Sequence, residues 1–384
     1  DVFNTRGVRT ASQSRMLADN VPDTDCHAQE RLRAAGGVLM GKTTTWEFAH
    51  GGPSWDVLAP PAHNPWNTER TPAGSSSGAA AAVAAGLCLA SIGTDTGGSI
   101  RGPAAACGVA GLKPTYGRVS RRGAMPNSPS QDHVGPLAWC VEDLAIVLQV
   151  LAGHDRFDST TTALDVPDYR SQLGNPITGL RIGVPYAWFT EETTVGAPTL
   201  AAFEAALAVL RDLGAIVVPV TLPPLVLYED TKKIIALCEL FSHYGEGLRL
   251  NPELHGENFR GRVIAGALVP AEDYLHAQRM RACLADAVQV VLRDADLLAL
   301  PTSEPAGKLV PTPPSALFTK LAYNAAFSVS GNPALSVCSG FDQDGMPLSL
   351  QLVGRLFDEG TVLRAGHQYE RATPWRARRP NCGR

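Results

Sequence analysis

The chain has 384 residues and a formal net charge of −4, with 37 acidic and 33 basic residues. The basic residues form no long run, which argues against nucleic-acid binding through a basic patch. The length is sufficient to bury a large core. The longest stretch of small apolar residues, at 79–93, is shorter than the ~20 strongly apolar residues of a membrane span. These features predict a globular protein that binds neither nucleic acid nor membrane.

Eight cysteines are scattered along the chain, and none forms a C-x-x-C pair. This spacing gives no indication of a zinc site. Most of the cysteines lie among apolar residues, such as Cys88 in GLCLAS and Cys338 in ALSVCSG. We interpret them as buried thiols of a protein from a reducing compartment, the cytoplasm, and we expect neither a metal nor another cofactor.

Apolar periodicity predicts helices that alternate with short strands. The expected helices lie at 25–35, 76–85, 141–152, 198–213, 232–247, 271–293 and 359–372. The expected strands lie at 38–40 (short and buried), 179–185, 215–220, 296–301, near 334–338 and at 348–353. Pro-rich stretches at 59–65 and 301–314 indicate surface loops. This alternation predicts an α/β fold with a sheet covered on both faces.

Two serines in residues 71–120 follow glycines: Ser75 comes after Gly74, and Ser99 comes after a glycine pair. A glycine before a serine lets the backbone approach a substrate closely, because no Cβ stands in the way. For either serine alone, the commoner role is a helix N-cap or a turn. The stretch contains no histidine, so an ordinary Ser-His-Asp arrangement has no local support.

The residues around Ser99 also suggest an oxyanion hole. Successive backbone N–H groups of Thr96, Gly97, Gly98 and Ser99 can converge on one oxygen atom. An acyl-transfer enzyme needs such donors where negative charge develops.

The segment GTDTGGSIRGPAAACGVAGLKPTYGRVS closely resembles the signature of the amidase signature family of serine hydrolases, and weaker similarity runs from GVRTASQS to LSLQLVG. The resemblance implies one α/β/α domain, residues 1–384, around a large, mixed, mostly parallel twisted sheet. It also implies a Ser-Ser-Lys triad with Ser99 as nucleophile and Ser75 as bridging serine. The family holds the peptide bond between Gly74 and Ser75 cis, and Gly74 is expected to contact substrate. Ala73, Ser77 and Ala79 depart from the common pattern of Gly, Gly and Ser.

The lysine of the triad is expected outside this sequence. In the family, a motif ending in lysine-aspartate precedes a segment that resembles VFNTRGVRT, so Asp1 aligns directly after that lysine. The chain is therefore expected to be N-terminally incomplete. None of the lysines at 42, 113, 232, 233, 308 and 320 matches the family's catalytic motif. A lysine accepts a proton only when it is neutral, and burial can lower its pKa enough for that.

Three other features have a chemical and a structural interpretation. GGVLMGKT at 36–43 matches a phosphate-loop pattern that ends in Lys42 and Thr43, but the loop lacks the strand before it and the helix after it. Nucleotide binding there is the alternative from a different class of protein. Asp95 and Arg101 are expected to form a pair that braces the glycines. Asp132 and His133 are expected to brace a loop, although this loop borders the active-site mouth in the family.

We therefore predict an amidase that hydrolyses a carboxamide through an acyl-enzyme on Ser99. Its expected partner is a small-molecule amide, with no nucleic acid and no membrane, and a homodimer is the candidate oligomer. The alternative within the family is the A subunit of a glutamine-dependent tRNA amidotransferase, which passes ammonia to a partner. The segment 261–288 resembles a free-standing amidase more than it resembles that amidotransferase component.

Overall fold

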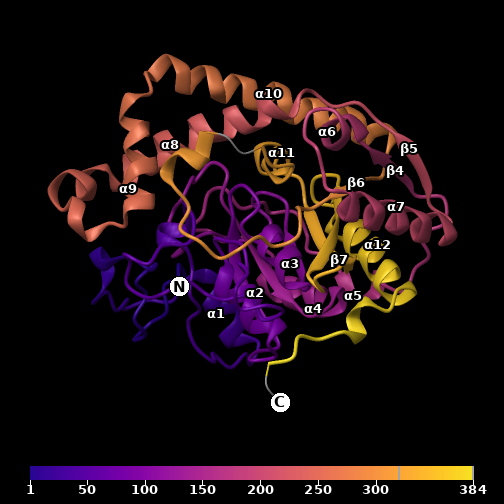
Figure 1. The fold of residues 1–384 in the computed structure, drawn as a ribbon. Helices are drawn as coiled ribbons and strands as arrows, with labels where there is room; N and C mark the ends of the chain where they lie inside the picture. The colour runs from indigo at the N-terminus through magenta and orange to yellow at the C-terminus, as the bar shows by residue number, and fades with distance from the viewer. Residues whose placement is uncertain (319–320, 383–384) are drawn as a thin grey trace.

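Eight short strands form one mixed sheet at the centre of the chain (Figure 1). The computed structural model describes residues 1–318 and 321–382. In sheet order the strands are β1 (Ala90–Asp95), β3 (His133–Ala138), β2 (Ala110–Lys113), β7 (Ala334–Phe341), β8 (Pro347–Gly354), β6 (Leu297–Pro301), β4 (Arg181–Val184) and β5 (Ile216–Pro219). The expected α/β fold around a large mixed sheet is confirmed.

The expectation that this sheet is mostly parallel is wrong. Only β4 pairs in parallel, with β5 and with β6, whereas the other neighbouring strands are antiparallel. One cause is a tight hairpin between β7 and β8, where Asp342 N–H donates to Met346 O and Gly345 adopts a φ of 75°. A short hairpin can join only antiparallel strands.

Helices cover both faces of the sheet (Figure 1). The Gln351 side chain of β8 reaches Arg101 of α3, whereas a Cβ on Gly354, three residues further, would contact Val362 of α12. Residues an odd number apart face opposite sides of a strand. The helices are α1 (His27–Ala34), α2 (Ser77–Ala84), α3 (Arg101–Cys107), α4 (Val141–Leu151), α5 (Tyr169–Gln172), α6 (Tyr186–Thr190), α7 (Ala197–Asp212), α8 (Leu225–Leu250), α9 (Glu257–Val263), α10 (Ala271–Asp294), α11 (Asn324–Val329) and α12 (Glu359–Ala372).

The long helices α8 and α10 pack against each other, and α9 lies between them in the chain at one end of the pair (Figure 1). The predicted helix at 232–247 is the middle of α8, which is longer at both ends. This helical arm is the part of the chain that faces the signature segment across the site described below.

The prediction of a buried strand at 38–40 is wrong. Val38 and Met40 are 81% and 75% exposed, and residues 37–44 form neither strand nor helix. An apolar run becomes a buried strand only where a neighbouring strand accepts its backbone hydrogen bonds. No strand within 1–318 or 321–382 pairs with this segment.

The cysteines and helices add two further observations. All eight cysteines are free. The expectation of buried thiols holds for Cys26, Cys107 and Cys140, whereas Cys88, Cys238 and Cys338 are only partly buried and Cys283 and Cys382 are exposed. Within the described ranges, no helix is both long enough and apolar enough to span a bilayer.

Candidate active site

The structure brings the two predicted serines into adjoining segments. Ser76 N–H donates to Ser99 O at 3.1 Å, so the turn that carries Ser75 lies directly against the glycine loop, which we define as residues 96–99. Ser75 is fully buried, and its Oγ makes no hydrogen bond within the described part of the chain. Five other serine hydroxyls in the described part of the chain also have no partner, so what distinguishes Ser75 is its place in the turn beside Ser99.

The backbone around Ser75 is held firmly by its neighbours. Ser75 O accepts hydrogen bonds from Thr45 Oγ1 at 2.9 Å and from Trp46 N–H at 3.2 Å. The peptide bond between Gly74 and Ser75 is cis, as the family resemblance implies. A Cβ on Gly74 would lie 2.1 Å from the Trp46 ring, so only glycine fits at this position.

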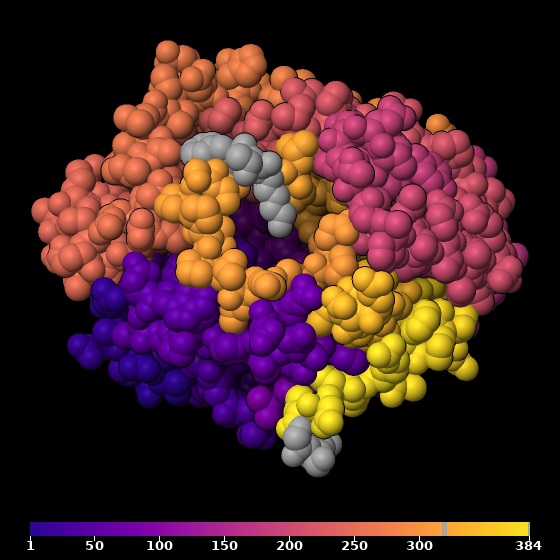
Figure 2. All heavy atoms as spheres, in the orientation of Figure 1, coloured from indigo at the N-terminus to yellow at the C-terminus, as the bar shows by residue number. Residues whose placement is uncertain are grey.

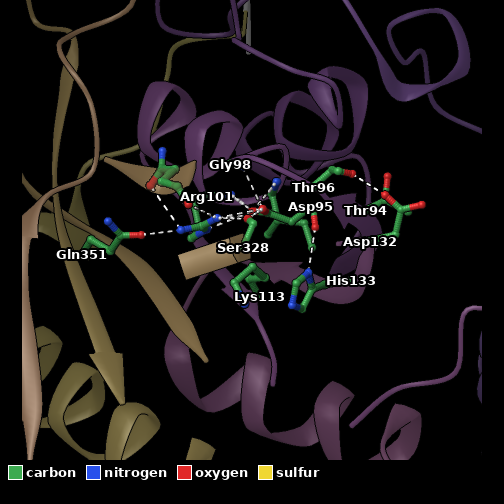
Figure 3. A network of polar contacts seen from close by, with 12 residues as sticks. Thr94, Asp95, Thr96, Gly98, Arg101, Lys113, Asp132, His133, Ser328 and Gln351 are labelled. Atoms are coloured by element: carbon green, nitrogen blue, oxygen red, sulfur yellow. Dashed lines mark hydrogen bonds and ion pairs between the residues drawn. The ribbon is translucent and has the colours of Figure 1, made fainter. Parts of the chain in front are cut away.

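A fully buried ion pair braces the glycine loop, as expected (Figure 3). Arg101 Nη2 lies 2.8 Å from Asp95 Oδ1, and the guanidinium also donates to Gln351 Oε1 at 2.8 Å and to Ser328 Oγ at 3.0 Å. Burial alone would raise the pKa of Asp95, but the Arg101 guanidinium outweighs burial and holds the pKa below its ordinary value. The pair therefore stays charged and ties β1 and α3 to β8 and α11.

This brace changes the set of expected oxyanion donors. Gly98 N–H donates to Asp95 Oδ1 at 2.8 Å, so it is not available to a substrate oxygen. The N–H groups of Thr96, Gly97 and Ser99 have no acceptor in the described part of the protein. Gly98 instead provides the turn, because it adopts a φ of 118° that other residues rarely tolerate.

Asp132 and His133 brace the same region. Thr96 Oγ1 donates to Asp132 Oδ1 at 2.5 Å (Figure 3). Asn127 N–H donates to Asp132 Oδ2 at 2.9 Å. His133 Nδ1 lies 3.0 Å from Asp95 O, and its ring is outside the cavity lining. Burial, together with the charge of Lys113, holds the pKa of His133 well below its ordinary value. The geometry therefore supports the expectation that Asp132 and His133 brace a loop.

The glycine loop opens into a cavity of about 590 Å³. Figure 2 shows it as a dark opening between the signature segment, in purple, and the orange segment around 301–316. Gly74 lines this cavity, as do Gly97, Gly98 and Ser99 of the loop. Of the predicted site residues, only Ser75 is not part of the cavity lining, because it is buried behind Gly74 in the chain. The cavity volume is within the usual range of a small-molecule site.

The cavity wall also carries charges from α8 and α9 that the sequence did not indicate. Lys232 of α8 and Arg262 of α9 line it, and His50 lies near both. Burial, reinforced by these two cations, lowers the pKa of His50 to about 3, so the imidazole is neutral at pH 7. Arg262 is 7% exposed, and no carboxylate in the described chain pairs with it. Burial lowers its pKa only to about 10, so it remains a cation.

Lys42 and Lys113, which lie close to the signature in the sequence, both have structural partners. Lys42 Nζ donates to Phe3 O at 2.5 Å and to Thr10 Oγ1 at 2.8 Å, and burial lowers its pKa to about 8. Lys113 is fully buried and donates to Asn332 O at 2.5 Å. Lys320 lies outside the described residues.

The alternative of nucleotide binding at 36–43 is wrong. No helix opens at Lys42, and no strand precedes residue 36, so the geometry of a phosphate loop is lacking. Among residues 1–318 and 321–382, no group of three or more His, Cys, Asp or Glu side chains could hold a metal ion.

Comparison with known proteins places these features in a family. The chain matches the Amidase family profile over residues 1–363. It is 42% identical to the A subunit of glutamyl-tRNA(Gln) amidotransferase from Chloroflexus aggregans, over 100% of this chain and 83% of that protein. The crystal structure of the corresponding Thermotoga maritima protein is 33% identical with a TM-score of 0.87, covering 97% of this chain and 82% of that chain. A peptide amidase from Stenotrophomonas maltophilia is 32% identical with a TM-score of 0.82, covering 99% and 82%.

These relatives correct the predicted set of partners. The prediction of a small-molecule amide as partner, with no nucleic acid, is wrong in this respect, because the similar proteins are by name subunits of an enzyme that acts on glutamyl-tRNA(Gln). Net charge and the lack of a basic run could not reveal such a link, since they describe only direct binding through a charged surface. From the profile match and the full-length identity together, the chain belongs to the amidase family.

Proposed function

We propose that this chain cleaves a carboxamide by acyl transfer through Ser99, as the amide-cleaving component of an amidotransferase similar to glutamyl-tRNA(Gln) amidotransferase. One observation carries the chemistry: the turn that holds the buried Ser75 lies directly against the glycine loop, and that loop opens into a cavity. A hydroxyl both donates and accepts, so it can relay a proton.

In the proposed reaction, Ser99 Oγ attacks the amide carbon and its proton passes to Ser75 Oγ. The carbonyl electron pair moves onto oxygen, where the N–H groups of Thr96, Gly97 and Ser99 stabilise it. Collapse of this intermediate re-forms the carbonyl and breaks the C–N bond, and the proton returned through Ser75 leaves with ammonia. Water then attacks the ester on Ser99, releasing the carboxylic acid and restoring the hydroxyl.

The relay needs a terminal base. The family resemblance makes that base a lysine, but Lys42 and Lys113 are engaged with backbone carbonyls. We therefore assign neither of them to the triad.

The cavity wall supports an amide that also carries a carboxylate, such as glutamine. Arg262 is a buried cation without a carboxylate partner, and leaving such a group unpaired is costly. A guanidinium binds a carboxylate through two parallel hydrogen bonds, which fixes orientation as well as charge. The α-carboxylate of glutamine would supply the missing partner while its side-chain amide reaches Ser99.

The test compares ammonia release from glutamine by the full-length protein, alone and with its partner subunits and glutamyl-tRNA(Gln). We expect glutamine hydrolysis that partner and tRNA stimulate and that Ser75→Ala slows more than tenfold, because the relay is lost. Rapid hydrolysis of peptide or simple amides without stimulation by partners would instead favour a free-standing amidase, the function named for the Stenotrophomonas maltophilia structure.

A further inference from the structure

Lys232 of α8 lies directly against the glycine loop. A Cβ built on Gly97 would be 3.1 Å from both Nζ and Cδ of Lys232, so the lysine side chain covers the face of Gly97 where a side chain would stand. The Lys232 side chain is 18% exposed. A cation is thus held, mostly out of water, beside one of the free N–H donors of the proposed oxyanion hole.

Glu229 fixes this lysine in place. Its Oε2 lies 3.4 Å from Lys232 Nζ, and its side chain is 2% exposed. Its Oε1 accepts a hydrogen bond from Ala322 N–H at 3.1 Å, just before α11. In α11, Asn324 Cβ lies 2.8 Å from where a Cβ on Gly98 would be. One buried carboxylate therefore holds the two elements that flank Gly97 and Gly98.

The charges around Glu229 leave a positive excess on the cavity side. Glu229 Oε2 also lies 3.8 Å from Lys233 Nζ, so one carboxylate serves two ammonium groups. Lys233 has a second acidic neighbour, Asp230 at 3.8 Å, which is 61% exposed. Lys232 has no acidic neighbour besides Glu229 in the described chain, and an ammonium has three donors.

We propose that Lys232 is a positioning residue for the reaction at Ser99: it packs against Gly97 and fixes a positive charge beside the oxygen that becomes negative when Ser99 attacks. This proposal rests on the proposed role of Ser99 as nucleophile. Fixed charges act strongly on a developing charge where water is partly excluded, because they need no reorganisation during the reaction. The effect is expected on the rate of the chemical step and not on substrate affinity.

The test uses a fluorophosphonate probe, so it does not depend on the natural substrate. Ser99 Oγ forms a bond to phosphorus, the P–F bond breaks, fluoride leaves, and the serine proton passes to water through Ser75. The phosphoryl oxygen occupies the place of the oxyanion. The first-order labelling rate and the concentration for half-maximal rate are measured for the full-length wild type and for Lys232→Met, Lys232→Arg and Lys233→Met.

We expect Lys232→Met to lower the maximal labelling rate about 10- to 100-fold, and Lys232→Arg to recover most of it, because the charge returns. Lys233→Met is the matched control, since Lys233 shares Glu229 but the atoms nearest to the Cβ position of Gly97 all belong to Lys232; its labelling rate should change less than about threefold. The thermal midpoints of Lys232→Met and Lys233→Met should be similar, because each variant loses one contact of Glu229 and the additional pair of Lys233, with the exposed Asp230, contributes little.

The inference is overturned if Lys232→Met labels at the wild-type rate, if Lys233→Met loses as much, or if Lys232→Arg fails to recover the rate while remaining folded. Failure of the underlying function has a different signature. If Ser99→Ala still reacts with the probe at the wild-type rate, Ser99 is not the nucleophile, whatever Lys232 does.

Discussion

Ser99 carries the proposed bond-making step, and its removal is the simplest prediction at the scale of a residue. Ser99→Ala should lower kcat/KM for amide hydrolysis at least about 10³-fold, because the covalent step is lost. The thermal midpoint should stay close to that of the wild type, since the side chain lies on the cavity lining. Ammonia release measured beside an unfolding curve checks both, and turnover that persists in a clean preparation would contradict the assignment.

Gly74 tests the geometry of the turn that carries Ser75. Gly74→Ala places a methyl group 2.1 Å from the Trp46 ring, so the turn or the indole must move. We expect a loss of about 1–3 kcal/mol in the free energy of unfolding, together with reduced activity. Gly174→Ala is the control, because nothing lies within 4 Å of its Cβ position. Equal effects of the two substitutions, measured by denaturant unfolding, would show that the close fit at Gly74 is unimportant.

The sequence could single out the two candidate serines but not the cations of the cavity wall. Ser75 and Ser99 lie in one local pattern with their glycines, so a linear reading is sufficient. Lys232 and Arg262 come from α8 and α9, far along the chain, and no local motif distinguishes them from surface cations. The sequence also could not predict that Gly98 N–H donates to Asp95 and so is unavailable to a substrate, because this hydrogen bond depends on the conformation of the loop.

At the scale of elements, the pair of Asp95 and Arg101 joins β1 and α3 to β8 and α11. Arg101→Met leaves the Asp95 carboxylate buried without its cation, which should cost about 3–5 kcal/mol in the free energy of unfolding. Arg170→Met is the matched control, because its pair with Glu142 is exposed and should contribute less than about 1 kcal/mol. Similar losses for the two variants in denaturant titrations would argue against Arg101 as a brace.

Glu47 joins the N-terminal segment to the start of α9. It accepts hydrogen bonds from Ser14 Oγ at 2.6 Å and from Gly256 N–H at 2.9 Å, yet burial raises its pKa to about 7. Because the folded state favours the protonated form, this contribution is present below about pH 4.5 and is lost as the pH rises to 7. The raised pKa corresponds to about 3 kcal/mol.

Glu47→Gln should therefore flatten the fall in stability between pH 4.5 and pH 7, because the amide does not titrate. Glu370 also has a pKa raised to about 7, so the difference between variant and wild type is the relevant quantity. Denaturant unfolding across this range measures it. A pH dependence identical in the two proteins would mean that Glu47 titrates normally.

Periodicity predicted the long helices well, because a buried stripe is a property of the helix itself. The stretches 141–152, 198–213 and 271–293 correspond to α4, α7 and α10 within a residue or two. Strand direction was not predictable in this way, since it depends on which strands become neighbours. The error at 38–40 has the same origin: apolar side chains alone do not supply a pairing strand.

In the whole molecule, one cavity is lined both by the glycine loop that carries Ser99 and by the cations Lys232 of α8 and Arg262 of α9. Arg262→Met should raise KM for glutamine at least about tenfold, because a bidentate carboxylate contact is lost, and Arg262→Lys should recover only part of it. Hydrolysis of propionamide, which has no carboxylate, should be unaffected by either change. A parallel rise in KM for both amides would indicate that Arg262 serves the shape of the cavity instead.

The glycine loop and Arg262 come from different segments of the chain, so the substrate specificity of the protein could change without a change at Ser99. The glycine loop is fastened by Asp95 to the sheet and α11, whereas Arg262 of the cavity wall belongs to α9. Exchanging residues 236–268, which include Arg262 but not Lys232, for the corresponding segment of a relative should redirect which amide is accepted, while the reactivity of Ser99 toward a small probe is largely retained. Substrate specificity would then change while the reacting serine and the loop that holds it stay the same.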